Sequence, residues 1–199
     1  ERDLLLPPPS RGTGLLALGN PDFGTSEVSG AGPPRRILRG VSGACLDPAK
    51  LSFEPLPASE LEVRAIARLW TRTGEPVHVV DRLRANENSV RTIGPGMRIL
   101  HFATHGFSFR AVCDAQADPA GAFRLAGLAL AGANQRPQGS SVVSAGLLTM
   151  QEVSALPLGG AEWVVLSGCD TGVGEIAEGE GVLGLRRSFQ LAGSRTVIM

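Results

Sequence analysis

The stretches RILHFATHG (residues 98–106) and WVVLSGCDTG (residues 163–172) decide the fold class of this 199-residue chain. Each begins with a short apolar run, typical of a buried β-strand, and passes directly into a turn that contains glycine. The first run leads to His105 and the second to Cys169. In an open α/β sheet, the carboxyl ends of neighbouring strands converge on one crevice, where ligands bind. A cysteine and a histidine that meet there form a nucleophile with its acid–base partner.

Apolar runs and amphipathic stretches alternate along the rest of the chain. We expect strands at 15–19, 76–80, 97–103, 161–166 and 195–199, with a further β-segment at 125–131. We expect helices at 59–70, 86–93, 147–156 and 180–192. This alternation predicts an α/β fold, in which a mostly parallel central sheet is covered by helices on both faces.

Local signals refine these elements. Ser59 is the expected N-cap of the first helix, whose apolar stripe should include Leu61, Ala65, Ile66 and Leu69. Residues 20–57 are rich in glycine, proline and serine and predict a long loop or insertion. We expect residues 107–124 to be irregular.

Composition excludes several classes of partner. Basic and acidic residues both number 19, so no net charge steers the chain toward nucleic acid or an acidic membrane. No apolar run is long enough for a membrane span, and we expect no secretory signal. The three cysteines are an odd number at irregular spacings, which does not fit a disulfide framework and favours a reducing, cytoplasmic setting. Only one basic residue, Lys50, is a lysine, a bias that fits a GC-rich bacterial genome.

The sequence predicts neither a metal site nor a cofactor site. His101 and His105 are four residues apart, but on a strand that spacing separates them by about 13 Å, too far to share an ion. We therefore expect His101 to be a core histidine. The glycine-rich segment 172–181 lacks the lysine and the spacing of a phosphate-binding loop. We expect it to be a loop that leads into the last helix.

The predicted strand ends supply the parts of a thiol peptidase. Cys169 lies between Gly168 and Gly172, which would let a substrate backbone approach closely. His105 would assist the thiol and protonate the leaving amine, while the N–H groups of Gly106 and Cys169 would form an oxyanion hole. The structural alternative is that Cys169 is a small buried residue and His105 a hydrogen-bonded loop histidine.

Six blocks of this chain, in this order, resemble the CHAT domain, a family of caspase-related peptidases that is often joined to tetratricopeptide repeats. The blocks are LLALGNP (15–21), LHFATHG (100–106), LALAGAN (128–134), GLLTMQEV (146–153), VVLSGCDTG (164–172) and GEGVLGLRRSFQLAG (179–193). The resemblance implies a caspase-like three-layer sandwich and a catalytic dyad of His105 and Cys169. It also implies cleavage of a protein substrate through an acyl-thioenzyme, without a cofactor, and regulation by an attached repeat or other sensor domain.

The chain departs from the family pattern at two places. Gly168 stands where the family more often has alanine, a change that should not affect the mechanism. The chain also ends at Met199 within an apolar strand, so we expect residues 1–199 to be a single peptidase domain truncated at its C-terminus. Some related families that cut after basic residues carry an aspartate at the position of Ser167, so a basic P1 residue is not favoured here. Asp170 would either contribute to the substrate pocket with Ser167 or cap the following turn.

Three functions compete at this point. The leading one is a cysteine endopeptidase, and the principal alternative is a catalytically silent, caspase-like module that binds proteins. A small-molecule cysteine hydrolase is the third, while a serine-elbow hydrolase is not supported because Gly-x-Ser-x-Gly is absent.

Overall fold

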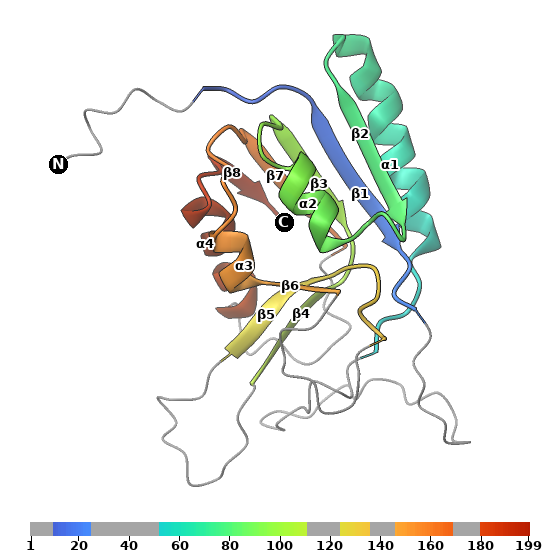
Figure 1. The fold of residues 1–199 in the computed structure, drawn as a ribbon, viewed down its shortest axis with the longest axis vertical. Helices are drawn as coiled ribbons and strands as arrows, with labels where there is room; N and C mark the ends of the chain where they lie inside the picture. The colour runs from blue at the N-terminus through green and yellow to red at the C-terminus, as the bar shows by residue number, and fades with distance from the viewer. Residues whose placement is uncertain (1–9, 25–51, 111–123, 136–145, 169–179) are drawn as a thin grey trace, which may run out of the picture.

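Five parallel strands form the central sheet, in the order β2-β1-β3-β7-β8 (Figure 1). The computed structural model describes residues 10–24, 52–110, 124–135, 146–168 and 180–199. The strands of this sheet are β1 (Leu15–Pro21), β2 (Val77–Arg82), β3 (Ile99–Ala103), β7 (Trp163–Ser167) and β8 (Thr196–Ile198). All five predicted strands are confirmed, with ends that differ by one to a few residues.

Helices cover both faces of the sheet. On one face lies α1 (Pro57–Trp70), while α2 (Glu87–Ile93), α3 (Met150–Ser154) and α4 (Glu180–Leu191) cover the other. Strand β1 contributes side chains to both faces of the sheet. Leu15 and Ala17 pack with Val63 of α1, while the alternate residues Leu16 and Leu18 face the opposite helical layer. The predicted α/β, caspase-like three-layer sandwich is confirmed.

A second, smaller sheet lies at the carboxyl ends of the central strands (Figure 1). It is antiparallel, with the order β4-β5-β6, and consists of β4 (Gly106–Arg110), β5 (Arg124–Ala129) and β6 (Leu147–Thr149). Two predictions are therefore wrong in part. Residues 107–110 are a strand because Phe107 is buried and pairs with Gly127. The predicted helix at 147–156 starts with strand β6, and α3 begins only after Thr149, which forms a capping box with Glu152.

The start and the buried face of α1 also differ from the prediction. The helix begins at Pro57, so Ser59 lies in the first turn and is not the N-cap. Its hydroxyl accepts a hydrogen bond from the backbone N–H of Asn20 (2.7 Å), which fixes the rotation of the helix on β1. The buried residues are Ser59, Val63 and Ala67, with Ile66 half-buried as predicted, whereas Leu61 and Leu69 are 70% and 62% exposed.

Other expectations from the sequence can be compared directly. The N-cap of α2 is Asn86, whose side chain accepts from the backbone N–H of Ser89 (2.9 Å). Of the predicted loop at 20–57, residues 25–51 lie outside the described residues, residues 20–21 belong to β1, and Pro57 begins α1. Within the part of the chain that the structure describes, no helix is long and apolar enough to span a membrane.

Candidate active site

The candidate site begins where β3 and β7 leave the central sheet side by side. The two strands pair in parallel, with Ala103 opposite Ser167. Thr104 is fully buried, and a Cβ atom added to Gly168 would lie 3.8 Å from the carbonyl oxygen of Thr104. Cys169 and Asp170, the next two residues, lie outside the described residues. The structure therefore brings the residues that precede His105 and those that precede Cys169 to one edge of the sheet.

His105 is oriented by a backbone carbonyl. Its Nε2 atom lies 2.9 Å from the carbonyl oxygen of Glu54. A carbonyl oxygen can only accept a hydrogen bond, so this contact requires the proton on Nε2. In the neutral ring, Nδ1 is then the unprotonated nitrogen, the one able to accept a proton from a thiol.

Two phenylalanine rings fix the plane of this imidazole. The ring centroid of His105 lies 5.5 Å from that of Phe23 and 5.9 Å from that of Phe53. Phe53 also contacts Phe107 of β4, at 6.3 Å between centroids, and all three phenylalanines are buried. Packing and the hydrogen bond together restrict both χ angles of the histidine.

The backbone on either side of His105 is tied to β5. The hydroxyl of Thr104 donates to the carbonyl of Ala129 (2.6 Å), and the N–H of Ala129 donates to the carbonyl of His105 (2.8 Å). Hydrogen-bonded and non-hydrogen-bonded positions alternate along an antiparallel ladder. Gly106 therefore occupies a position at which its N–H points away from β5.

The remaining predicted residues can be placed in turn. Ser167 is half-buried at the end of β7. His101 is a buried core histidine, as predicted, and its Nε2 atom contacts Oε1 of Glu62 in α1 at 2.8 Å. In the described ranges, no group of three or more His, Cys, Asp or Glu side chains could hold a metal ion.

Sequence reasoning missed the groups that surround the histidine. Phe23, Phe53 and Glu54 all fall in the segment predicted as a loop, and no periodic pattern marks them. Their contact with His105 joins residues about 50 to 80 positions apart, so it arises only in the folded chain. The sequence offered one signal, Phe53 shortly before the first helix, because an apolar side chain there is expected to pack against another part of the protein.

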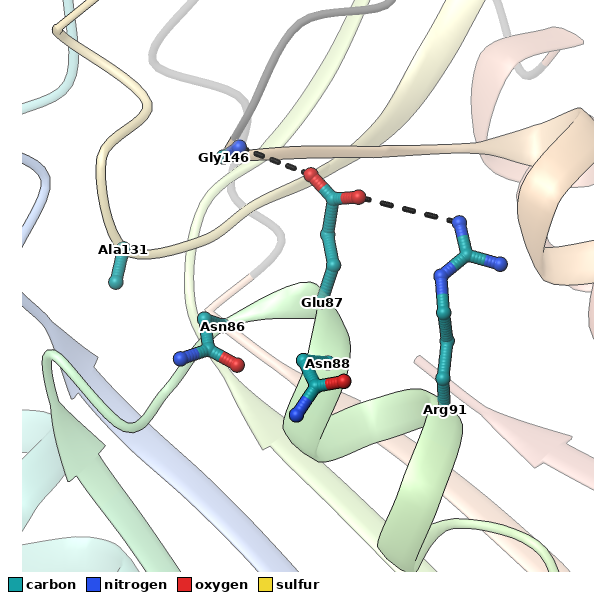
Figure 2. Close-up of a pocket in the computed structure, with 6 residues that line it drawn as sticks. All are labelled: Asn86, Glu87, Asn88, Arg91, Ala131 and Gly146. Atoms are coloured by element: carbon teal, nitrogen blue, oxygen red, sulfur yellow. Dashed lines mark hydrogen bonds and ion pairs between the residues drawn. The ribbon is translucent and has the colours of Figure 1, made fainter.

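An open pocket lies at the start of α2 and is lined by Asn86, Glu87, Asn88, Arg91, Ala131 and Gly146 (Figure 2). Glu87 accepts a hydrogen bond from the N–H of Gly146 (2.9 Å) and lies 3.9 Å from Arg91. Burial raises the pKa of the Glu87 carboxyl above its ordinary value of 4.5. Arg91 also pairs with Glu152 (2.8 Å). These charged groups are engaged with one another, and the lining holds no nucleophile, so the pocket does not compete with the site at His105.

Comparison with protein families gives one result that covers nearly the whole chain. A family model described as the CHAT domain matches residues 2–199. No curated protein matches the chain.

Proposed function

Because the chain belongs to the CHAT domain family, which is related to caspase-like peptidases, we propose that it is a cysteine endopeptidase that uses His105 and Cys169. The observation that carries this proposal is the environment of His105. The ring is anchored through Nε2, flanked by two phenylalanines, and located beside the strand that leads to Cys169.

The proposed reaction has two stages. The Cys169 thiol transfers its proton to Nδ1 of His105, and the thiolate attacks the carbonyl carbon of the scissile peptide bond. The C–N bond then breaks as His105 returns the proton to the leaving amine, which leaves a thioester on Cys169. In the second stage water attacks the thioester, His105 takes a proton from the water, and the acid product leaves as the thiol is restored.

The hydrogen bond to Glu54 supports both proton transfers. It keeps the proton on Nε2, so Nδ1 is available to accept a proton from the thiol. When the ring becomes an imidazolium, Nε2–H still donates to the same carbonyl, which stabilises the positive charge. No carboxylate is required as a third group.

Gly106 is the first proposed donor of the oxyanion hole. Its N–H points away from β5 and follows directly on His105, which supports this role. The N–H of Cys169 is the second proposed donor, in the manner common for a nucleophile at a strand-to-loop turn. The absence of a side chain at position 106 lets a substrate carbonyl approach.

The proposal extends to substrate and setting. Ser167 and Asp170 are proposed to line the pocket for the residue before the cleaved bond. The substrate is a protein or peptide, the proposed compartment is the cytoplasm, and a tetratricopeptide-repeat or other sensor domain is the proposed regulatory partner.

The pH dependence of cysteine alkylation tests the proposed dyad without a known substrate. Iodoacetamide labelling of Cys45, Cys113 and Cys169 would be followed by mass spectrometry in the wild type and in His105→Ala. We expect Cys169 to react well below pH 8, where an ordinary thiol with a pKa of about 8.5 is protonated. His105→Ala should abolish this difference and leave the other two cysteines unchanged.

A second experiment asks whether the thiol cleaves peptides. A library of fluorogenic peptides would be assayed with the wild type, Cys169→Ala and His105→Ala. We expect no turnover with Cys169→Ala and a loss of roughly 10²- to 10⁴-fold with His105→Ala, the usual contribution of general acid–base catalysis. A reactive Cys169 with no cleavage of peptides or proteins would instead favour the silent binding module.

A further inference from the structure

Asn134, in the turn that follows β5, binds the backbone of Phe53 in both directions. Its Oδ1 atom accepts from the N–H of Phe53 (2.9 Å), and its Nδ2 atom donates to the carbonyl of Phe53 (3.0 Å). The same Nδ2 atom donates to the carbonyl of Gly24 (3.2 Å). The side-chain amide thus replaces one residue of a β-ladder between two segments 81 positions apart in the sequence.

The backbone of this turn holds the other aromatic segment. The N–H of Asn134 donates to the carbonyl of Phe23 (2.8 Å), and the N–H of Gly132 donates to that of Asp22 (2.9 Å). One turn therefore binds the chain at Phe23 and at Phe53, whose rings flank His105. Figure 1 shows the described end of this turn beside the start of the segment at 52–56.

The turn is itself anchored to regular structure, so it can act as a fixed support. The N–H of Ala131 donates to the carbonyl of Ala85 (2.8 Å), just before α2. Within the turn, the N–H of Ala133 donates to the carbonyl of Leu130 (3.1 Å). Gly132 adopts φ 87°, a left-handed conformation that favours glycine.

We propose that Asn134 is a positioning residue for His105, an inference that rests on the proposed peptidase function. Asn134 fixes the backbone of Phe53. The carbonyl of the next residue, Glu54, accepts a hydrogen bond from Nε2 of His105, and this contact leaves Nδ1 to accept a proton from the thiol. Asn134 lies outside the reacting groups and acts through this chain of contacts.

An amide is required at this position for a chemical reason. Phe53 offers both an N–H and a carbonyl, so its partner has to accept and donate at once, and an ionised aspartate can only accept. Asn134→Asp should therefore keep the bond from the Phe53 N–H and lose those to the carbonyls of Phe53 and Gly24. Asn134→Ala should lose all three.

The first readout is the protonation of the His105 ring, which does not depend on any substrate. The chain has three histidines, so two-bond hydrogen–nitrogen NMR correlations can be assigned by comparison with His78→Gln and His105→Ala. Above about pH 8, where an ordinary imidazole is neutral, we expect a single Nε2–H tautomer for His105 in the wild type. Asn134→Ala and Asn134→Asp should give a mixture of tautomers at His105 and leave His78 and His101 unchanged.

The second readout is the pH profile of Cys169 alkylation with iodoacetamide. We expect both Asn134 variants to move its midpoint upward by about one pH unit, which lowers the rate about tenfold below the midpoint. Gln135→Ala removes the neighbouring side chain, which is exposed and lies against Gly24 but makes none of the three Asn134 hydrogen bonds, and should leave both readouts unchanged. Ser194→Ala removes a buried hydrogen bond to Phe189 (2.8 Å) and should lower the melting temperature without moving either readout.

The outcomes separate this proposal from the proposed function. A His105 tautomer that is unchanged in a folded Asn134 variant overturns the positioning role, even if the wild type proves to be an active peptidase. A His105 tautomer that changes in the Asn134 variants, while the wild type cleaves nothing, supports the contact chain and refutes the peptidase. If Asn134→Ala does not fold, Asn134→Asp, which keeps one of the three bonds, provides the same test.

Discussion

Thr104 illustrates how much of the candidate site depends on single buried polar groups. Its hydroxyl donates to the carbonyl of Ala129 at 2.6 Å, and its side chain is fully buried beside His105. The hydrogen bond anchors the end of β3 to β5 at the point where the chain turns out of the central sheet. A valine at this position would have nearly the same shape but would leave that carbonyl without its side-chain donor.

We expect Thr104→Val to lower the free energy of unfolding by about 1–2 kcal/mol, the usual cost of leaving a buried group unsatisfied. Urea denaturation measures the change. Thr92→Val is the matched control, because its hydroxyl bonds to Asn88 (2.7 Å) on an exposed part of α2 and should matter by less than about 0.5 kcal/mol. Equal effects of the two variants would contradict the prediction.

Gly168, the residue before the proposed nucleophile Cys169, provides a second test. It adopts φ 81°, and a Cβ atom there would meet only ordinary contacts, so the cost of alanine comes from the backbone alone. We expect Gly168→Ala to lower stability by about 1 kcal/mol and to change the alkylation rate of Cys169. The sequence interpretation, which treated alanine as interchangeable here, did not include this conformation.

Gly74→Ala is the control for that experiment. Gly74 has φ 75° and open space around it at the C-terminal end of η3 (Thr71–Thr73), far along the chain from the site. The same loss of stability is expected, with no change at Cys169. If both variants leave Cys169 unaffected, the backbone at position 168 does not orient the thiol.

Among the elements, α1 shows where sequence patterns succeed and fail. A helix over these residues was predictable because apolar and polar positions alternate with helical spacing. Its buried face was not, because two leucines are exposed while the smaller residues Val63 and Ala67 are buried. Gly19 of β1 explains this preference, because a Cβ atom there would lie 2.8 Å from Val63, so helix and strand approach too closely for larger side chains.

The rotation of α1 makes a direct prediction. Val63→Ala should lower the free energy of unfolding by roughly 1.5–3 kcal/mol, because it removes buried methyl groups from a close contact. Leu61→Ala, on the exposed side, should change it by less than about 0.5 kcal/mol. Chemical denaturation measures the change in unfolding free energy for both variants. A larger loss for Leu61→Ala than for Val63→Ala would show that the face predicted from the sequence is the buried one.

The elements of the candidate site were likewise predictable from the sequence only in part. The end of β3 at His105 was predictable, because a continuous apolar run into His-Gly identifies a buried parallel strand. Strand β4 was missed because its short Gly-Phe-Ser-Phe run has too few residues to show a period. The contacts of Glu54 and Asn134 could not be predicted, because hydrogen bonds between distant segments leave no local pattern in the sequence.

In the whole molecule, the two sheets share one hydrophobic core. Leu128 and Leu148 of the small sheet belong to the same buried cluster as Leu18, Phe102 and Phe189 of the main sandwich. The small sheet, which begins at Gly106, therefore cannot move independently of the strands that lead to His105 and Cys169. This shared core gives the candidate site a rigid base on both sides of the histidine.

The pH dependence of stability is a property of the whole chain to which Glu87 and Glu162 contribute with opposite signs. Burial raises the pKa of Glu87, so its contribution to stability is present below pH 4.5 and is lost as the pH rises through its raised pKa. A hydrogen bond from Arg11 lowers the pKa of Glu162, so its contribution is present above pH 4.5 and is lost as the pH falls.

We therefore expect the unfolding free energy of Glu87→Gln minus that of the wild type to increase from pH 4 to pH 7. The same difference for Glu162→Gln should decrease over that range, only slightly, because Glu162 is exposed to solvent screening. Urea denaturation across the range measures both curves. Parallel curves for the two variants would contradict the assignment.

The acceptor that orients His105 is a main-chain oxygen, and this has a consequence for genetics. Every amino acid supplies that oxygen, so a screen that replaces Glu54 with each of the other residues would score the position as dispensable. The Glu54 side chain is exposed, so its replacement should also have little effect on packing. Only changes that displace the main chain, such as a deletion within 52–55 or an insertion before Pro55, would reveal the position. Selection at this position would therefore preserve the length of the segment and leave the identity of residue 54 free to vary, whereas Phe53 stays constrained by its contact with His105.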